Sequence, residues 1–268
     1  MTGGAVTIAG SDSSGGAGIQ ADLKTFAALG VYGASVITAL TAQNTRGVSA
    51  IHDVPAGFIT TQIDAVFSDL DIAAVKIGML SQAAAIDVVA QGLDRHRAKN
   101  VVLDPVMVAT SGDRLLAPDA VEALRALLIP RALVITPNVP EAAALLERTP
   151  ARSELEMEAQ ARALLELGAR SVLIKGGHGE GAESVDLLVD ATSVTRFAAT
   201  RIATRNTHGS GCTLSSAIAA GLARGLDLKT AARDAKSYVT AAIAAADNLH
   251  VGHGHGPLHH FYAQWRNP

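Results

Sequence analysis

Short apolar runs alternate along the chain with longer segments in which apolar residues recur at helical spacing. The short runs are rich in Val, Ile and Ala and are bounded by Gly, Pro or Asn, which is typical of strands. We therefore predict strands at Ala5–Ala9, Ser35–Ala39, Ala74–Ile77, Asn100–Leu103, Ala132–Ile135, Ser171–Ile174 and Val185–Val189.

The longer segments carry apolar residues three and four positions apart, as on one buried face of a helix. Several are closed by a glycine, which is the usual residue just after a helix end. We predict helices at Ala17–Leu29, from Pro55 through Leu70, at Gln82–Arg97 and Pro118–Leu128, a short helix after Pro140, and further helices at Glu154–Leu167, from about Cys212 onward, and at Leu228–Ala246.

Strand and helix alternation predicts a doubly wound α/β fold with a mostly parallel sheet between two layers of helices. The continuously apolar run Val101–Leu103 is typical of a strand covered on both faces. The more polar, alternating stretch Val48–Val54 indicates an edge strand or a small flap. Because no repeat or linker interrupts the 268 residues, we expect one domain over residues 1–268.

Composition and charge exclude several classes of protein. A chain that is 49% hydrophobic and 18% charged is globular rather than disordered, and its net charge of -3 argues against general nucleic-acid binding. The apolar runs are too short to span a membrane, and the first residues lack the layout of a signal peptide. One cysteine cannot form an intrachain disulfide, so we expect a cytoplasmic protein.

That cysteine, Cys212, lies where the loop Asn206–Gly211 meets the start of a predicted helix. A helix start leaves backbone N–H groups without partners and carries partial positive charge, so Gly209, Ser210 and Gly211 could form an anion cradle. The same field would lower the pKa of the Cys212 thiol. An ordinary tight turn with a small buried cysteine explains this local sequence equally well.

Further polar residues follow predicted strands. The loop of residues 10–18 lacks the glycine spacing of a dinucleotide site, and no P-loop motif occurs. Asp104 and Glu141 could hold Mg²⁺ together with phosphate oxygens. Alone, Asp104 is explained as a turn or helix cap, and Glu141 as a first-turn charge that complements the helix dipole. Lys175 could meet phosphate oxygens, although solvated loop lysines are common. Taken together, these groups favour phosphoryl transfer, with Cys212 within reach of an acceptor hydroxyl as a candidate base.

Several long segments, in this order, resemble hydroxymethylpyrimidine/phosphomethylpyrimidine kinase of thiamine biosynthesis, a family of the ribokinase-like superfamily. The similarity runs nearly end to end. It is carried by residues 15–22 (GGAGIQAD), 41–45 (TAQNT), 76–79 (KIGM), 136–138 (TPN), 175–178 (KGGH) and 207–213 (THGSGCT).

The resemblance implies a mostly parallel sheet between helices with a small flap, and an enzyme that uses ATP and Mg²⁺. The substrate would be 4-amino-5-hydroxymethyl-2-methylpyrimidine, which would be phosphorylated to the monophosphate and then to the diphosphate. By motif, the substrate pocket would contain Gly10, Asp22, Gln43, Met79 and Val106; the nucleotide would meet Lys175, Thr207 and Lys236; the metal would meet Asp104 and Glu141; and the catalytic group would be Gly209, Ser210, Gly211 and Cys212.

Other interpretations stay open at this point. A pyridoxine or pyridoxal kinase would also phosphorylate a hydroxymethyl group on an aza-ring, although Gln43 and Met79 favour the pyrimidine. A non-catalytic pyrimidine-binding regulatory protein is the alternative of another class. The histidine-rich stretch His250–His260 is interpreted as C-terminal packing rather than a metal site. The oligomeric state is left open, with a homodimer as one option.

Overall fold

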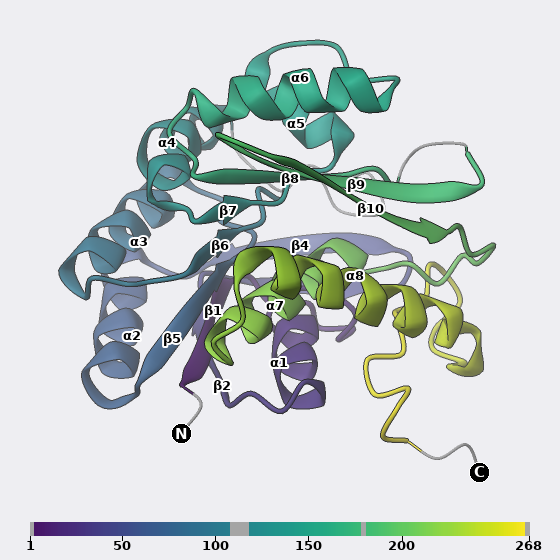
Figure 1. The fold of residues 1–268 in the computed structure, drawn as a ribbon. Coiled ribbons are helices and arrows are strands. Elements are labelled where there is room, and N and C mark those ends of the chain that lie inside the picture. The colour runs from purple at the N-terminus through teal and green to yellow at the C-terminus, as the bar shows by residue number, and fades with distance from the viewer. Residues whose placement is uncertain (1–2, 108–117, 178–180, 266–268) are drawn as a thin grey trace.

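The computed structural model describes residues 3–107, 118–177 and 181–265, and its centre is one eight-stranded sheet (Figure 1). The strands of this sheet are β1 (Gly4–Ala9), β2 (Gly33–Ile37), β5 (Ile72–Ile77), β6 (Val101–Leu103), β7 (Val134–Ile135), β8 (Ser171–Lys175), β9 (Glu183–Asp190) and β10 (Val194–Thr200). Their order is β10-β9-β8-β7-β6-β5-β1-β2. All pairs are parallel except β8 with β9 and β9 with β10, so the predicted mostly parallel sheet is confirmed.

Helices cover both faces of the sheet (Figure 1). One layer contains α2 (Ala56–Asp69), α3 (Ala83–Arg95), α4 (Pro118–Ala123), α5 (Val139–Leu146) and α6 (Glu154–Leu165), and the other contains α1 (Gly18–Ala28), α7 (Ser210–Ala223) and α8 (Leu228–Ala244). Shorter helical turns lie at Leu124–Leu128, Ile129–Arg131 and Ala246–Asn248. None of the helices within the described ranges is long and apolar enough to cross a membrane.

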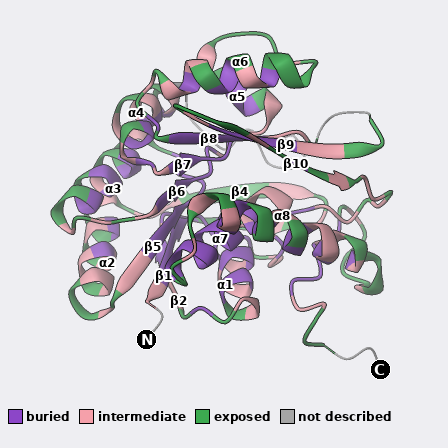
Figure 2. Cartoon of the chain, viewed as in Figure 1, coloured by how far each residue is buried: buried purple, intermediate pink, exposed green. Residues whose placement is uncertain are grey.

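Each face of the sheet has its own hydrophobic core, because neighbouring side chains on a strand point to opposite faces. On β1, Val6 and Ile8 join the cluster under α2 and α3, whereas Ala5 joins the cluster with Phe26 of α1 and Ile218 of α7. Figure 2 shows the buried residues concentrated on the sheet and on the inward helix faces. This double burial explains why the central strands are continuously apolar in sequence.

A separate antiparallel hairpin, β3 (Ala39–Asn44) with β4 (Gly47–Asp53), forms the flap that the sequence predicts around Val48–Val54. Its pairing register shifts between Ala42 and Gln43, as at a β-bulge. Bulges re-aim a side chain relative to its strand. The shift therefore sets the direction of Gln43 within the flap.

Three element predictions differ from the structure. The predicted strand Ser35–Ala39 is divided, because the Thr38 N–H donates to Ala9 O (3.0 Å) and the Thr38 hydroxyl to Met79 O (3.0 Å), which turns the chain from β2 into the flap. Strand β10 was not predicted, because its alternating exposed residues offer little apolar signal. The predicted helix Pro118–Leu128 changes to a π-helical turn after Ala123. The one-domain organisation stays a prediction.

Candidate active site

The carboxyl ends of β1, β5, β6 and β8 open onto a cavity of about 660 Å³, a volume suited to a small-molecule ligand. The chain leaves β1 toward β2 and later returns to β5 on the other side of β1, so the cavity lies at the switch point of the sheet. The structure brings almost all predicted site residues into its lining: Gly10, Gln43, Met79, Asp104, Val106, Glu141, Lys175, Thr207, Gly209, Ser210, Gly211, Cys212 and Lys236.

The predicted anion cradle lies at the start of α7. Gly209 is the residue before the helix and has φ +82, a conformation that favours glycine. A Cβ atom at Gly209 would lie 1.9 Å from the carbonyl oxygen of Gly16, so a side chain there has no space. The first turn of α7 therefore offers backbone N–H groups and the positive end of the helix dipole to the cavity. This geometry fits a phosphate group.

Cys212 lies in this first turn and lines the cavity. Burial raises the pKa of its thiol to about 11, although the nearby Lys76 ammonium acts in the opposite direction. The prediction of a lowered pKa is therefore wrong, because desolvation of the thiolate outweighs the favourable helix field and the lysine charge. At neutral pH the free protein carries a protonated thiol at this position.

Asp104, Glu141 and Lys175 form a charged group beside the cradle, where a Cβ atom at Gly211 would lie 3.1 Å from Lys175 Nζ. Lys175 Nζ lies 2.7 Å from Asp104 Oδ1 and 3.8 Å from Glu141 Oε2. Although burial opposes its charge, the two carboxylates raise the pKa of Lys175 to about 12. Burial raises the pKa of Glu141 to about 7, against the attraction of Lys175. Lys175 therefore stays cationic, whereas Glu141 is close to its titration point at neutral pH.

Both carboxylates also have structural roles. Asp104 accepts a hydrogen bond from the Thr136 hydroxyl (3.1 Å). Glu141 and Asn138 form a capping box at the start of α5, with Asn138 N–H donating to Glu141 Oε2 at 2.7 Å. Glu141 therefore lies in the first turn of the helix, as its sequence position predicts, and the capping box fixes its carboxylate at the cavity wall rather than excluding a ligand role.

The same two carboxylates fit Mg²⁺ only as part of a larger set of ligands. In the described part of the chain, no three His, Cys, Asp or Glu side chains gather into a cage that could hold a metal alone. Mg²⁺ commonly takes one or two carboxylates and completes its octahedron with water and phosphate oxygens. Asp104 and Glu141 suit that arrangement because both line the cavity, and Asp104 lies beside the phosphate cradle: a Cβ atom at Gly211 would be 3.8 Å from Asp104 Oδ2.

The predicted substrate end of the cavity contains Gly10, Gln43, Met79 and Val106. A Cβ atom at Gly10 would lie 2.4 Å from Met79 Cε, so the glycine gives the thioether its space. Gln43 comes from the flap, and its amide oxygen accepts a hydrogen bond from the Thr41 hydroxyl at 3.2 Å. An amide group can pair with both a ring nitrogen and an amino group, because it carries a donor and an acceptor.

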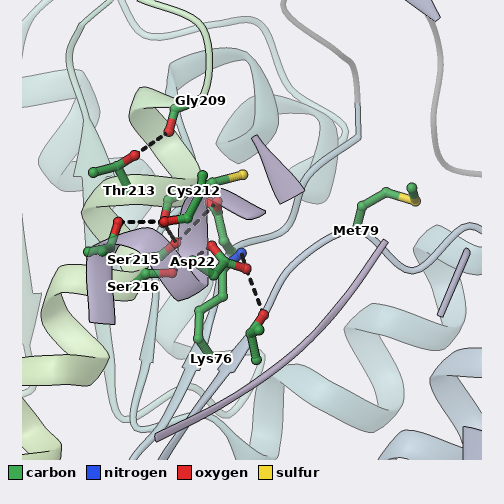
Figure 3. A network of polar contacts seen from close by, with 12 residues as sticks. Asp22, Lys76, Met79, Gly209, Cys212, Thr213, Ser215 and Ser216 are labelled. Carbon is green, nitrogen blue, oxygen red and sulfur yellow. Dashed lines mark hydrogen bonds and ion pairs between the residues drawn. The ribbon is translucent and has the colours of Figure 1, made fainter. Parts of the chain in front are cut away.

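Asp22 is the exception among the predicted substrate residues. It is fully buried and lies beneath the cavity, where its carboxylate accepts hydrogen bonds from Thr7 (2.6 Å), Lys76 (2.8 Å) and Ser216 (2.6 Å). Figure 3 shows Asp22 and Lys76 close together below Cys212, with the Cys212 sulfur directed toward the side where Met79 lies. The structure thus does not bring Asp22 into the cavity lining, because its carboxylate is directed to Thr7, Lys76 and Ser216 instead.

The predicted nucleotide residues lie on one side of the cavity. Thr207 precedes the cradle, and Lys236 reaches the cavity from α8. The Lys236 ammonium donates to Asp186 Oδ2 (2.8 Å) and to Ser184 Oγ (3.1 Å). Lys236 is therefore an anchored cation rather than a solvated helix lysine. His178, part of the motif that follows Lys175, lies outside the described residues.

Sequence reasoning gave no role to Asp12, Lys76, Arg201 and His208, which also line the cavity. Lys76 lies in a strand where a fully buried lysine has no local pattern to reveal it. Asp12 and His208 are 196 residues apart in the chain, although His208 Nε2 lies 2.8 Å from Asp12 Oδ2. The sequence offered one indication that these two residues belong to the site: each lies in a loop that also carries one of the glycine motifs.

The cradle, the lysines and the paired carboxylates all serve to neutralise and position a phosphoryl group, which is the main task of a kinase active site. Together with the order of the strands, this site defines the chain as a kinase with the ribokinase-like fold. Residues 12–259 match the family model described as phosphomethylpyrimidine kinase. The chain belongs to the phosphomethylpyrimidine kinase family.

Individual relatives agree with this family. The chain is 60% identical over 267 residues to a hydroxymethylpyrimidine/phosphomethylpyrimidine kinase of Rhizobium meliloti, with 100% of both chains covered. A crystal structure of phosphomethylpyrimidine kinase from Clostridium difficile shares 47% identity and has a TM-score of 0.79, covering 89% of this chain and 98% of the other. An ADP complex of Bacillus subtilis pyridoxal kinase shares 36% identity with a TM-score of 0.91, covering 99% and 100%.

Proposed function

We propose that the chain transfers the γ-phosphoryl group of ATP to 4-amino-5-hydroxymethyl-2-methylpyrimidine and then transfers a second phosphoryl group to the monophosphate, as a step of thiamine biosynthesis. The observation that supports this proposal most directly is a single cavity. One end of it contains Gln43 and Met79, which suit a pyrimidine ring, and the same cavity includes the phosphate cradle at Gly209–Gly211. The name of the 60% identical Rhizobium meliloti relative supports the same substrate and its phosphate.

The residues divide the work between recognition and charge neutralisation. The Gln43 amide would pair with the aminopyrimidine edge, and the Met79 thioether would pack against the ring. The N–H groups of the cradle would surround the transferring phosphoryl group, with Lys175 and Lys236 neutralising the nucleotide phosphates. Asp104 and Glu141 would hold Mg²⁺, which would neutralise negative charge on the nucleotide phosphates.

The two phosphorylations make different demands on Cys212. The first acceptor is an alcohol, whose proton must leave as the bond to phosphorus forms. The second acceptor is a phosphate oxygen that is already anionic at neutral pH. Cys212 lines the cavity at the cradle, so it is the candidate to receive that alcohol proton, and it has no comparable task in the second step. Because burial raises the pKa of the thiol in the free protein to about 11, this role requires that Cys212 first lose its proton to become the thiolate.

The test is a product assay with ATP, Mg²⁺ and the hydroxymethylpyrimidine, followed by separation of the phosphorylated products. Both the monophosphate and the diphosphate are expected, in that order. Monophosphate alone would show a one-step salvage kinase. Clear preference for pyridoxal over the pyrimidine, measured as kcat/KM for each, would contradict the proposed substrate.

Pyridoxal is the informative competitor because the Bacillus subtilis pyridoxal kinase has nearly the same backbone fold. Fold similarity of this kind does not select between two aza-rings that both carry a hydroxymethyl group. The Gln43 side chain would select the pyrimidine, because the pyrimidine presents a ring nitrogen beside an amino group. Gln43→Leu should therefore lower kcat/KM for the pyrimidine by at least about tenfold and change turnover of pyridoxal much less.

A further inference from the structure

Asp12 organises the loop between β1 and α1 from its centre. Its carboxylate accepts hydrogen bonds from the backbone N–H groups of Ser14 (2.9 Å), Gly16 (3.1 Å) and Ala17 (2.8 Å), and from the Ser14 hydroxyl (2.7 Å). Although burial opposes its charge, the hydrogen bonds from His208 and Ser14 lower the pKa of Asp12 to about 2. The loop that carries Gly10 of the pyrimidine end is therefore wound around one ionised carboxylate.

His208 connects this loop to the phosphate cradle. Its Nε2 atom lies 2.8 Å from Asp12 Oδ2, and both side chains are almost fully buried. Because an ionised carboxylate only accepts hydrogen bonds, Nε2 of His208 carries a proton and donates it. His208 immediately precedes Gly209, so this contact connects the first residue of the cradle to the loop of residues 10–17, which we call the acceptor loop.

Close backbone packing supports the same connection. A Cβ atom at Gly16 would lie 2.4 Å from His208 Cδ2, and one at Gly209 would lie 1.9 Å from Gly16 O. The His208 N–H donates to Gly256 O (3.1 Å), which fixes the backbone of His208 from the opposite side. The two loops therefore lie in close contact, and the imidazole–carboxylate pair is a polar link between them.

We propose that the His208–Asp12 pair is a positioning device that sets the phosphate cradle in register with the acceptor loop, so that the phosphoryl group passes to the pyrimidine hydroxyl rather than to water. His208 acts through the two loops and is a positioning residue, not a catalytic one. Phosphoryl transfer requires the acceptor oxygen in line with the leaving oxygen, and a misplacement of about 1 Å can cost about 100-fold in rate.

The inference rests on the proposed kinase function and predicts a specific failure. When the cradle and the acceptor loop lose their register, ATP still binds to the cradle, but the acceptor hydroxyl is no longer in line. A water molecule then attacks the γ-phosphorus, the bond to the ADP oxygen breaks, and inorganic phosphate and a proton are released. The number of phosphorylated pyrimidines formed per ADP therefore decreases.

The experiment measures ADP and phosphorylated pyrimidine in the same reaction with the full chain, ATP, Mg²⁺ and the hydroxymethylpyrimidine. We expect His208→Ala to lower the product-to-ADP ratio at least twofold relative to the wild type. His208→Gln should restore most of it, because a glutamine amide can donate from nearly the position of Nε2. The ratio does not depend on how much of the variant folds, since unfolded chains form neither product.

His260→Ala is the matched control. His260 is also buried, and its Nε2 lies 3.0 Å from the Thr213 hydroxyl on α7, but among the described residues no hydrogen bond or ion pair joins it to the acceptor loop. We expect a lower melting temperature for His260→Ala and an unchanged ratio. If His208→Ala forms as many phosphorylated pyrimidines per ADP as the wild type, or if His260→Ala lowers this ratio equally, the inference is overturned but the proposed function is not. A wild type that forms no phosphorylated pyrimidine overturns the proposed function and this inference with it.

Discussion

The ionisation of a single side chain, Cys212, shows how two opposing effects are decided by their size. A helix N-terminus and the Lys76 ammonium favour the thiolate, while burial and the carboxylates of Asp22 and Asp104 favour the thiol. Helix ends contribute about 0.3–1 kcal/mol in exposed positions, whereas burial of an unpaired ion costs several times more. Motif position alone therefore gave the wrong direction for the pKa.

Alkylation of Cys212 checks this electrostatic balance directly, because the chain contains one cysteine. With the pKa raised to about 11, the free enzyme should react with iodoacetamide at pH 7.5 at least about tenfold more slowly than free cysteine. The rate should increase about tenfold per pH unit between pH 8 and 10. The reaction is followed by mass spectrometry, with Cys212→Ser as the unreactive control. Rapid labelling at pH 7.5 would show that the helix field prevails.

Gly209 permits a second test at the same scale. Gly209→Ala places a methyl group against the Gly16 carbonyl and also strains a backbone with φ +82. Positive φ costs an alanine about 1 kcal/mol, and the clash should add about 1–3 kcal/mol. We therefore expect a loss of about 2–4 kcal/mol in the free energy of unfolding in urea, together with a large decrease in kcat.

Gly225→Ala separates these two effects. Gly225 has nearly the same φ (+85), and an added Cβ would meet no atom within 4 Å. This variant should lose only the backbone contribution of about 1 kcal/mol and keep its activity. Equal destabilisation of the two variants would mean that the contact between Gly209 and Gly16 relaxes without cost.

Among the elements, the flap hairpin depends on a segment from the far end of the chain. The tip residue Thr45 accepts hydrogen bonds from the backbone N–H groups of His253 (3.3 Å), Gly254 (3.1 Å) and His255 (2.8 Å). A two-stranded hairpin alone is marginally stable in water. The histidine-rich segment therefore supports the hairpin that carries Gln43, which gives its predicted packing role a definite partner.

Gly254→Ala should loosen this support, because its Cβ would lie 2.0 Å from the Thr45 carbonyl oxygen. We expect faster amide hydrogen exchange in β3 and β4, and a higher KM for the pyrimidine with a smaller change in kcat. Gly57→Ala is the matched control, since no atom lies within 4 Å of an added Cβ at Gly57. Unchanged exchange in the flap of Gly254→Ala would show that the segment does not stabilise it.

The elements also show what apolar patterning can and cannot predict. Strands β1, β5 and β6 were predicted within two residues because burial on both faces leaves continuous apolar runs. Strand β10 has a sheet neighbour on one side only and shows exposed residues along most of its length. The division of Ser35–Ala39 depends on hydrogen bonds from Thr38 to Ala9 and Met79, which local sequence does not encode.

For the whole molecule, the buried histidine His260 predicts a loss of stability in acid. Burial, with the charges of Lys24 and His259, lowers the pKa of His260 to about 4. The unfolded chain therefore binds more protons than the folded protein below the ordinary histidine pKa of about 6.5. Stability should fall by up to about 3 kcal/mol as the pH falls from 6.5 to 4.

Urea unfolding at pH 7.5, 6.0 and 5.0 measures this dependence. His260→Gln should be less stable than the wild type at pH 7.5, because it removes the buried imidazole. Since glutamine cannot titrate, the difference in the free energy of unfolding between the two proteins should narrow as the pH is lowered. A difference between the two proteins that stays constant with pH would contradict a neutral, buried His260.

Across the whole molecule, the site residues could be predicted where they lie in contiguous sequence motifs, as at Gly209–Cys212 and Lys175. Contacts between distant parts of the chain could not be. Asp22 was assigned to the pocket through the family resemblance of its motif, and only the three-dimensional structure shows its carboxylate paired with Lys76 beneath the cavity. Direction of a side chain on a helix follows from packing, which a motif does not contain.

The order of the strands has a consequence for synthesis on the ribosome. Strand β1 emerges before the other strands of the sheet and ends in its interior, between β5 and β2, and one face of it is covered by α1 and by α7, whose last residue is Ala223. Until α7 is translated, Ala5, Phe26 and their apolar neighbours lack their native cover. Nascent chains that stall before α7 should therefore depend on chaperones and be readily degraded.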